Sequence, residues 1–525
     1  MKEKISELLK KTIDVLQKET KLPSFKISSV FVEYPENSVY GDFSTNLAMR
    51  IGKTIKKNPL EIAELIKERL ESSDNQSLFT KIEVVKPGFI NFFLSKDIIQ
   101  KQIGEILEQG KDFGNINIGK NKKVQVEFIS ANPTGPLTVA NARGGPMGDV
   151  IANILNKSGF KVEKAYYVNN YGGQVMALGH SVLQDDKTEY KGEYIKELAK
   201  KIKEKDPYKA GKKAVEIIVN MIKKTTDKMG IQYDEWISES DFHEKGKVDE
   251  LIDSLGDLIY KKEGAAWFKS TKFGDRRDRV LIKSDKWKTY LAGDLALHDY
   301  KLKKFDRLIN IWGADHHGDI PGLMAVIEAL GHKGKLEIIL YQFVTILEGG
   351  EKKKMSKRQG TFVTMDELLK EVGKDVVRFF FLQKSANTHL NFDLSLAKEQ
   401  SEKNPVYYIQ YAYARICSIL KKSRIQPIAK DTDFQLLNDP LELRLIKQLI
   451  KLPEIIKDTA KDYQVQRLPK YVFETASCFH KFYKNCHVLT ENKELSNARL
   501  GLILATKIVL KNTLDIMGIS APEKM

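Results

Sequence analysis

Residues 124–168, VQVEFISANPTGPLTVANARGGPMGDVIANILNKSGFKVEKAYYV, decide the fold of this chain. Val124, Val126 and Phe128 alternate with polar residues, which is the two-residue period of a strand. A turn rich in glycine and proline follows, then an apolar helical pattern over 147–160 and a second strand-like run over 161–168. Strand, tight turn, helix and strand in this order form a βαβ unit, so the segment predicts a parallel sheet.

The residues before this unit predict a separate small α+β domain over 1–112. Residues 1–20 have helical spacing, and short apolar runs over 28–34, 81–85 and 89–94 predict strands. Asn58 precedes Pro59 at the start of a third apolar pattern, which predicts a capped helix ending near residue 71. Residues 111–123, with two glycines and several polar residues, are the expected linker.

The residues after the unit complete two further domains. We expect an α/β domain over 118–395 that contains a lysine-rich helical insertion near 185–262. Strand-like runs over 279–283, 307–312 and 335–347 then resume the sheet. From 400 to 525 the apolar residues recur every three or four positions, which predicts an all-α bundle.

Composition limits the class of protein and its partners. The 525 residues include 86 Lys and Arg against 70 Asp and Glu, a net charge of +16 that favours a polyanionic partner. Alternatively, most lysines only solvate the surface. Apolar residues make up 42%, which excludes a disordered chain, and no apolar run is long enough to predict a membrane span. The mixed charges of the first helix argue against a signal peptide, and three scattered cysteines indicate the reducing cytoplasm.

The turn after the first strand is a candidate ligand site. Its sequence, ANPTGPLTVANARGGPMGD over 131–149, places small residues and hydrogen-bond donors where a helix begins beyond a parallel strand. Free N–H groups at such a helix N-terminus bind phosphate. The turn matches neither of the common glycine-rich phosphate motifs, and many such turns need glycine for conformation alone.

A second signal is the basic segment 348–362, EGGEKKKMSKRQGTF. Four lysines and an arginine lie close to glycines, so the segment could close over a triphosphate and stabilise charge on pyrophosphate. A solvated basic loop is the alternative reading.

These two segments resemble the HIGH and KMSKS signatures of class I aminoacyl-tRNA synthetases. ANPTGPLTVANARGG (131–145), INIWGADHHGDIPGL (309–323), KMSKRQGTFVTMDELL (354–369), VEYPENSVYGDFSTNLAMRIGK (32–53) and ARLGLILATKIVLKNTLDIMG (498–518) are together similar to arginyl-tRNA synthetases. The resemblance covers essentially the whole chain. It implies a multidomain α/β fold, with a Rossmann-like domain between an N-terminal tRNA-binding domain and a C-terminal anticodon-binding bundle.

The resemblance implies ligation of arginine to tRNA-Arg through an arginyl-adenylate, with ATP and Mg²⁺ as the substrate complex. We expect no tightly bound metal, no membrane partner, a monomer and a cytoplasmic location. His316 and His317 suggest a metal, but no third ligand has suitable spacing.

Carboxylates pair well with the forked donors of a guanidinium. The family pattern places arginine binding at Glu127, Asn132, Tyr290 and Asp294. Tyr290 and Asp294 are four residues apart and therefore on one helix face. A helix-terminal charge is the alternative role for Asp294.

The resemblance also implies the residues that contact ATP. The expected ATP-binding residues are Pro133, Gly135, Ala140, Arg143, Asp315, His317, Met355 and Ser356, and the expected catalytic residues are Thr138, Asn141, Lys354 and Lys357.

Two further pairs are expected to contact tRNA. Phe89 and Asn91 are two apart on a strand, where a ring and an amide could receive a base. Tyr411 and Arg415 lie four apart on a helix and, by family analogy, face the anticodon. The alternative for Phe89 is a place in the core.

One departure from the family pattern bears on activity. Thr138, Val139, Ala140 and Asn141 stand where the family motif has two histidines around an apolar residue and glycine. Threonine and asparagine can still donate hydrogen bonds, although they are neutral and shorter. The Ala140 methyl group also takes space that glycine would leave for adenine. The chain is therefore either an active ligase, which we favour, or a tRNA-binding protein without catalysis.

Overall fold

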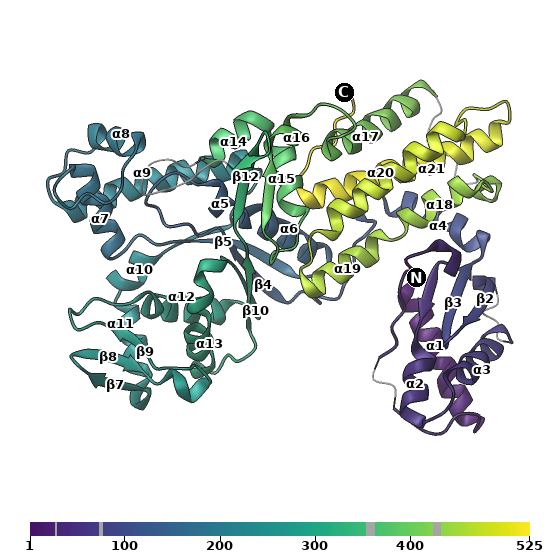
Figure 1. Ribbon diagram of the computed structural model, residues 1–525, viewed down its shortest axis with the longest axis horizontal. Helices are drawn as coiled ribbons and strands as arrows, with labels where there is room; N and C mark the ends of the chain where they lie inside the picture. Colours follow the sequence, from purple (N-terminus) through teal and green to yellow (C-terminus); the bar gives the residue numbers. More distant parts are fainter. Residues whose placement is uncertain (27–28, 73–76, 353–362, 424–431) are drawn as a thin grey trace. The chain divides into compact units, whose positions relative to one another are not determined.

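The computed structural model describes residues 1–26, 29–72, 77–352, 363–423 and 432–525 (Figure 1). Two compact units divide the chain. The first consists of Met1–Phe113, Ile419–Glu454 and Ser477–Val509, and the second of Gly114–Ser418, Ile455–Ala476 and Leu510–Met525. Within the described residues, no helix is long and apolar enough to cross a membrane.

A five-stranded parallel sheet forms the centre of the second unit, in the order β11-β10-β4-β5-β6. Its strands are β4 (Lys123–Phe128), β5 (Lys161–Val168), β6 (Glu235–Ser238), β10 (Arg307–Gly313) and β11 (Leu336–Tyr341). In Figure 1, β4 of the first half lies between β5 and β10, and β10 belongs to the second half. The chain order reverses between β4 and β10, and ligands bind at this point in sheets of this type.

The predicted βαβ unit is confirmed. Val124 of β4 pairs in parallel with Val162 of β5, and helix α6 (Gly144–Lys157) connects the two strands. Helix α6 packs so closely on the sheet that a Cβ atom at Gly148 would lie 2.2 Å from the Phe128 ring. Glycine is therefore required at this contact, since any side chain would push α6 off β4.

Three predicted strands differ from the structure. Residues 279–282 form β9, which belongs to a separate antiparallel sheet with β7 (Ile259–Lys262) and β8 (Ala265–Phe268), so the prediction that this run continues the main sheet was wrong. Residues 344–348 form β12, which pairs with β13 (Glu351–Lys352) and β14 (Leu390–Asp393). The predicted strand over 28–34 contains only an isolated bridge at Glu33 among its described residues.

Helices surround the main sheet. The short helix α5 (Val139–Ala142) and α6 lie between β4 and β5 in the sequence. After β5 come α7 (Gly173–Leu183) and then, in the lysine-rich region, α8 (Glu193–Lys201) and α9 (Pro207–Lys228). The predicted helical insertion differs from the structure at its end, because residues 235–238 form β6, an edge strand of the main sheet. The remaining helices are α10 (Glu239–Glu244), α11 (Lys247–Ser254), α12 (Tyr290–Lys304), α13 (Ile320–Ala329), α14 (Met365–Val372), α15 (Lys374–Leu382) and α16 (Leu394–Lys398).

A buried ion-pair network joins α6, α15 and the end of the chain. The guanidinium of Arg378, which is fully buried, pairs with Asp149 and donates 2.6 and 3.0 Å hydrogen bonds to the carbonyls of Met517 and Met229. Lys164 Nζ lies 2.6 Å from the other oxygen of Asp149. Every charge in this network is paired, as burial requires.

The first unit contains the predicted N-terminal α+β fold. A three-stranded antiparallel sheet, β1-β3-β2, is formed by β1 (Phe43–Thr45), β2 (Phe79–Val85) and β3 (Phe89–Leu94). Its helices are α1 (Lys2–Lys18), α2 (Leu47–Ile55), α3 (Pro59–Glu71) and α4 (Lys96–Gln109). The predicted cap is confirmed, because Asn58 Oδ1 accepts a 3.0 Å hydrogen bond from the amide of Leu60.

The described residues after 400 are helical, as predicted. The α-helices are α17 (Pro405–Lys422), α18 (Pro440–Leu449), α19 (Leu452–Asp462), α20 (Arg467–Asn485) and α21 (Lys493–Met517). Pro440 begins α18 behind a capping box made by Asp439 and Glu442.

Candidate active site

The candidate site lies at the carboxyl ends of β4 and β10. Directly after β4, Ile129 and Ser130 have φ values of +67° and +39°. A β-branched residue in the left-handed region is a strained conformation of the kind that clusters at functional sites. The Ser130 hydroxyl is held in place, since it accepts a 3.0 Å hydrogen bond from the Tyr167 amide and donates one of 3.1 Å to Glu127.

Helix α12 brings two of the predicted arginine-binding residues to this end of the sheet. Tyr290 is its first residue and is half-exposed, and Asp294 follows one turn later. Burial, together with the nearby carboxylates Glu127 and Glu239, holds the pKa of Asp294 well above its usual range. Asp294 thus lies in a strongly negative environment, which a bound cation would relieve.

Glu239 is a residue of this site that sequence analysis missed. It follows β6 as the first residue of α10 and is 5% exposed, and its Oε2 atom has no hydrogen-bond partner among the described residues. A Cβ atom at Gly293 would lie 2.8 Å from Glu239 Oε1, so the absent side chain leaves room for this carboxylate. The acid directly after a strand was a usable signal, but β6 was not recognised as a strand of the main sheet.

Other buried polar atoms next to Glu239 also have unused hydrogen-bonding capacity. The Tyr167 hydroxyl and both ring nitrogens of His243 have no partner within the described parts of the chain. His243 Nε2 lies 3.7 Å from Glu239 Oε1, and its ring stacks on Tyr171 with 3.8 Å between centroids. Buried polar groups are normally satisfied, so this cluster is suited to a polar, cationic ligand.

Glu127 and Asn132 are also near the switch point, but each already has a partner within the protein. Glu127 is 3% exposed, and its Oε2 lies 2.8 Å from Nζ of Lys301. Asn132 Oδ1 accepts a 2.7 Å hydrogen bond from Asn169 Nδ2, which leaves the amide nitrogen of Asn132 as its donor.

The segment with Thr138 and Asn141 forms a tight turn at the start of α5. The Thr138 hydroxyl donates a 2.6 Å hydrogen bond to Asn141 Oδ1, and the Asn141 amide N–H donates one of 3.3 Å back to Thr138 Oγ1. The Tyr341 hydroxyl donates a 3.1 Å bond to the Asn141 carbonyl. Because Oδ1 is occupied as an acceptor, the side-chain nitrogen of Asn141 is the group that can donate to a ligand.

The glycine-rich turn before this segment is closely packed. Pro133 and Gly135 are buried, and Ala140 is half-buried. A Cβ atom at Gly135 would lie 3.1 Å from the Tyr194 ring, whose hydroxyl donates a 3.0 Å bond to the Thr134 carbonyl.

The basic segment is anchored at both ends close to these residues. Before it, β12 and β13 pair at Leu347 and Lys352. After it, Val139 N–H donates to the Val363 carbonyl at 3.3 Å, and Met365 N–H donates to the Leu137 carbonyl at 2.8 Å. The predicted residues Lys354, Met355, Ser356 and Lys357 lie outside the described residues.

Arg143 has a different environment from the one predicted for an ATP contact. It is fully buried, and its guanidinium donates to the carbonyls of Gln342 and Ser385, the latter at 3.1 Å. Burial lowers its pKa to about 10. This buried guanidinium joins the turn to the segment after β11, and its Nε atom has no hydrogen-bond partner among the described residues.

The loop after β10 carries the remaining predicted ATP residues. Asp315 and His317 are exposed on a short 3₁₀ turn over Ala314–Gly318. His316 lies between two acids, with Nδ1 3.4 Å from Asp319 Oδ2. No cluster of three or more His, Cys, Asp or Glu side chains suited to a metal is found in the described residues.

The four residues predicted for tRNA contact are placed differently from one another. Phe89 is 38% exposed, whereas Asn91 is 2% exposed and its Oδ1 accepts a 2.7 Å hydrogen bond from Ser44. In the second unit, the Arg415 guanidinium lies 4.7 Å from the centroid of the Tyr411 ring, so these two side chains form one pair on α17.

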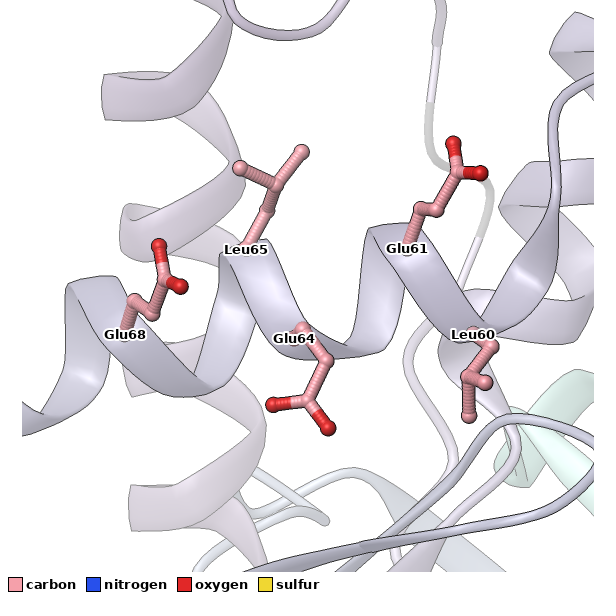
Figure 2. Close-up of a pocket in the computed structure, with 5 residues that line it drawn as sticks. All are labelled: Leu60, Glu61, Glu64, Leu65 and Glu68. Atoms are coloured by element: carbon pink, nitrogen blue, oxygen red, sulfur yellow. The ribbon is translucent and has the colours of Figure 1, made fainter.

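A hollow beside α3 in the first unit is not suited to this chemistry (Figure 2). Its lining side chains, Leu60, Glu61, Glu64, Leu65 and Glu68, all project from that helix. Three carboxylates on one helix would repel the phosphates of a nucleotide.

The parallel sheet, its switch-point turn and the anchored basic segment define a class I aminoacyl-tRNA synthetase, and the comparisons with known proteins identify which one. The family models "tRNA synthetases class I (R), catalytic domain", "Arginyl tRNA synthetase N terminal domain" and "DALR anticodon binding domain" match residues 102–387, 1–94 and 409–525. The chain therefore belongs to the arginyl-tRNA synthetase family, which confirms the prediction from its sequence.

Individual relatives are similar to this chain over nearly the full length of both sequences. The chain is 41% identical to the arginine–tRNA ligase of Caldanaerobacter subterraneus over 100% of its own length and 99% of the relative's, and 41% identical to that of Bacillus subtilis over 98% and 99%. A crystal structure of a Campylobacter jejuni protein titled an arginyl-tRNA synthetase matches at 33% identity with a TM-score of 0.75, covering 82% of this chain and 100% of that one. The Thermus thermophilus arginyl-tRNA synthetase, at 21% identity and a TM-score of 0.78 over 100% of both chains, shows the same fold.

Proposed function

We propose that this chain, an arginine–tRNA ligase by its family relationship, forms arginyl-adenylate at the carboxyl ends of β4 and β10. The arginine carboxylate attacks the α-phosphate of ATP, pyrophosphate leaves, and the arginyl group then passes to the terminal ribose of tRNA-Arg. The observation that carries the proposal is the convergence of three carboxylates, Glu127, Glu239 and Asp294, around the start of α12.

In this proposal Asp294 and Glu239 receive the guanidinium of arginine. A guanidinium presents paired donors, and both carboxylates can accept them with geometry that a lysine ammonium cannot match. The raised pKa of Asp294 supports this role, because a positive ligand would replace the repulsion between the carboxylates by attraction. Tyr290 closes the outer side of the pocket, and Glu127 and Asn132 line the side nearest β4.

The phosphates of ATP lie, in this proposal, against the turn that contains Thr138 and Asn141. The segment Thr138–Asn141 replaces the histidine-containing motif of the family, and the Asn141 side-chain nitrogen donates to a phosphate where an imidazole would. Lys354 and Lys357 supply the positive charge that stabilises the departing pyrophosphate. Pro133, Gly135, Ala140, Asp315, His317, Met355 and Ser356 complete the nucleotide site.

Magnesium is expected to arrive on the phosphates of ATP, since Mg²⁺ keeps water and substrate oxygens among its ligands. Phe89 and Tyr411 with Arg415 are proposed tRNA contacts, because exposed rings and guanidinium planes stack on unpaired bases. Asn91, which is buried, supports the strand that carries Phe89. A monomeric state and a cytoplasmic location remain predictions from the sequence.

A second candidate function is supported by one observation, the neutral residues at 138 and 141. A chain that binds tRNA without activating arginine would keep the anticodon-binding bundle and lose turnover. The favoured reading is the active ligase, because a pocket of three carboxylates has no use in a protein that only binds RNA.

Arginine-dependent exchange between ATP and labelled pyrophosphate tests the proposal, measured with and without tRNA-Arg. We expect exchange with arginine, none with lysine, and charging of tRNA-Arg in a parallel aminoacylation assay. Absence of exchange and charging at high enzyme concentration would refute catalysis. Tight binding of tRNA-Arg in the same preparation would then favour the second candidate.

A further inference from the structure

A buried chain of hydrogen bonds runs beneath the proposed arginine pocket, and the proposed mechanism does not use it. It starts at Ser130, passes through Glu127 to Lys301, and continues through Asn310 to His298. Lys301 Nζ donates 2.8 and 3.2 Å hydrogen bonds to Glu127 Oε2 and Asn310 Oδ1. Asn310 Nδ2 lies 3.0 Å from His298 Nε2.

The far end of this chain reaches the residue that we assign to the guanidinium. His298 Nδ1 lies 2.8 Å from the main-chain carbonyl of Asp294. The chain of hydrogen bonds therefore connects three elements that meet at the switch point: β4 through Glu127, β10 through Asn310, and the first turns of α12 through Asp294.

Within this series of hydrogen bonds, and among the described residues, Lys301 is the only cation that can neutralise the Glu127 carboxylate. Lys301, His298 and Asn310 have no exposed surface. Burial and the neighbouring Lys301 lower the pKa of His298 to about 3, so His298 is neutral at physiological pH. A buried ammonium is tolerated only with a carboxylate and further acceptors around it, which is the arrangement found here.

The same cation also acts on the pocket. Burial is the main cause of the raised pKa of Asp294; Glu127 raises that pKa further and Lys301 lowers it. On helix α12, Lys301 lies two turns after Asp294, and the following lysines Lys303 and Lys304 are exposed.

We propose that Lys301 is a positioning residue for arginine recognition, which it serves by fixing Glu127 of β4 relative to Asp294 of α12. The inference rests on the proposed role of these carboxylates in binding arginine. Lys301 does not touch the substrate. It holds Glu127 through an ion pair and Asp294 through Asn310 and His298, and so fixes the two carboxylates relative to each other.

A purely structural role is the competing explanation. Buried ion pairs can often be replaced by apolar residues with little loss of stability when both partners are changed together. Such a pair would affect the melting temperature of the protein, but not the KM for arginine measured on the folded enzyme.

Four variants separate the two explanations: Lys301→Met, Glu127→Gln, the double variant, and Lys303→Met as a matched control. Lys303 is on the same helix but exposed, with an ion pair to Asp299 at 2.7 Å. Each variant is assayed as the full chain for the KM of arginine and kcat in pyrophosphate exchange, for inhibition by L-citrulline, a neutral isostere of arginine, and for thermal unfolding.

We expect Lys301→Met to raise the KM for arginine by about tenfold or more, because a misplaced charge partner weakens recognition of the cation. The change in kcat should stay below about threefold, since the phosphate side is untouched. Preference for arginine over citrulline should fall. The double variant should have the same KM as Glu127→Gln alone, because Lys301 acts through Glu127, and should melt at a higher temperature than Lys301→Met.

A KM for arginine within about twofold of the wild type in folded Lys301→Met, with only the melting temperature lowered, would overturn the proposal. So would a lowered KM, which is what simple removal of a nearby positive charge predicts. If Lys301→Met does not fold, Lys301→Leu replaces it with the same criteria, because leucine also removes the ammonium that holds Glu127. Failure of the proposed function is distinguishable, since it would abolish exchange in the wild type itself.

Discussion

The two sides of the candidate site differ in the charge of their side chains. The arginine side is charged and is fixed from beneath by buried hydrogen bonds that connect β4, β10 and α12. On the phosphate side, the described residues present neutral donors, with Asn141 held by Thr138. The cations expected there belong to residues 353–362, outside the described part of the chain.

This difference indicates that specificity and chemistry are separable in the molecule. The carboxylates that we propose for arginine lie on β4, α10 and α12, where contacts within the protein position them. Charge that stabilises pyrophosphate would come from residues between β13 and the Val363 pairing, which lie outside the described part of the chain. Damage to each side should therefore give a different kinetic pattern.

The largest effect should come from the arginine side. Asp294→Asn should lower kcat/KM for arginine by about three orders of magnitude, because a buried site built for a cation loses one of its charges. Pyrophosphate exchange measures this effect, and Asp299→Asn on the same helix is the control. An equal loss of ATP binding in Asp294→Asn would contradict the separation of the two sides.

The next effect should come from the basic segment. Lys357→Ala should lower the rate of adenylate formation by about a hundredfold, since a charge that stabilises the transition state is lost. The affinity for tRNA should change little. Rapid-quench measurement of adenylate and filter binding of tRNA test both parts, with Lys352→Ala at the base of the segment as control. Parallel losses of both quantities would assign Lys357 to RNA binding instead.

The neutral donor should contribute less than a charged one. Asn141→Ala should slow adenylate formation by about thirtyfold, because a neutral amide stabilises phosphate charge less than a cation does. Thr138→Ser should remain near the wild-type rate, since it keeps the hydroxyl that holds Asn141. A wild-type rate in Asn141→Ala would remove this residue from the catalytic set.

Acid should destabilise the arginine side through His298. The pKa of His298 is lowered to about 3 by burial, whereas in the unfolded chain it has the ordinary value of 6.5. Between these values only the unfolded state binds the proton, so stability falls as pH decreases from about 6.5, by up to about 1.4 kcal/mol per pH unit. Urea unfolding at several pH values measures the slope. His298→Asn should flatten it and His317→Asn should not.

We expect the smallest effect from a substitution outside the candidate site, at the proposed tRNA contact Phe89. Phe89→Ala should raise the KM for tRNA-Arg several-fold, to about tenfold at most, because one stacking ring is lost. The KM for arginine should stay unchanged. Leu489→Ala, which removes another exposed apolar side chain of the first unit, is the control, and equal effects in both variants would indicate a nonspecific loss.

Local patterns in the sequence predicted much of the fold. The βαβ unit over 124–168, the Asn58 cap and the C-terminal helices depend on periodicity and capping, which act over a few residues. The wrong placement of 279–282 and the missed role of 235–238 have a common cause. A four-residue strand has the same sequence pattern whichever sheet it joins. Which sheet it joins depends on pairing partners that are distant in the sequence.

The site residues also divide into those that local sequence spacing could place and those that depend on distant residues. The spacing of Tyr290 and Asp294 was sufficient to place them on one face of α12. Arg143 was assigned to ATP and Lys301 was not assigned, since a basic residue in a sequence indicates a ligand or solvent by default. Their burial depends on carbonyls at 342 and 385 and on a carboxylate 174 positions away.

The buried contact of Arg378 with the carbonyl of Met517 has a consequence for how the chain unfolds. Gly518 has φ +65°, and a Cβ atom there would lie 2.4 Å from Arg378 Nη2, so the guanidinium fills the space directly behind the end of α21. Residues 510–525 group with the sheet, although most of α21 groups with the other unit. The last turns of that helix are therefore expected to open together with the sheet rather than with the rest of α21.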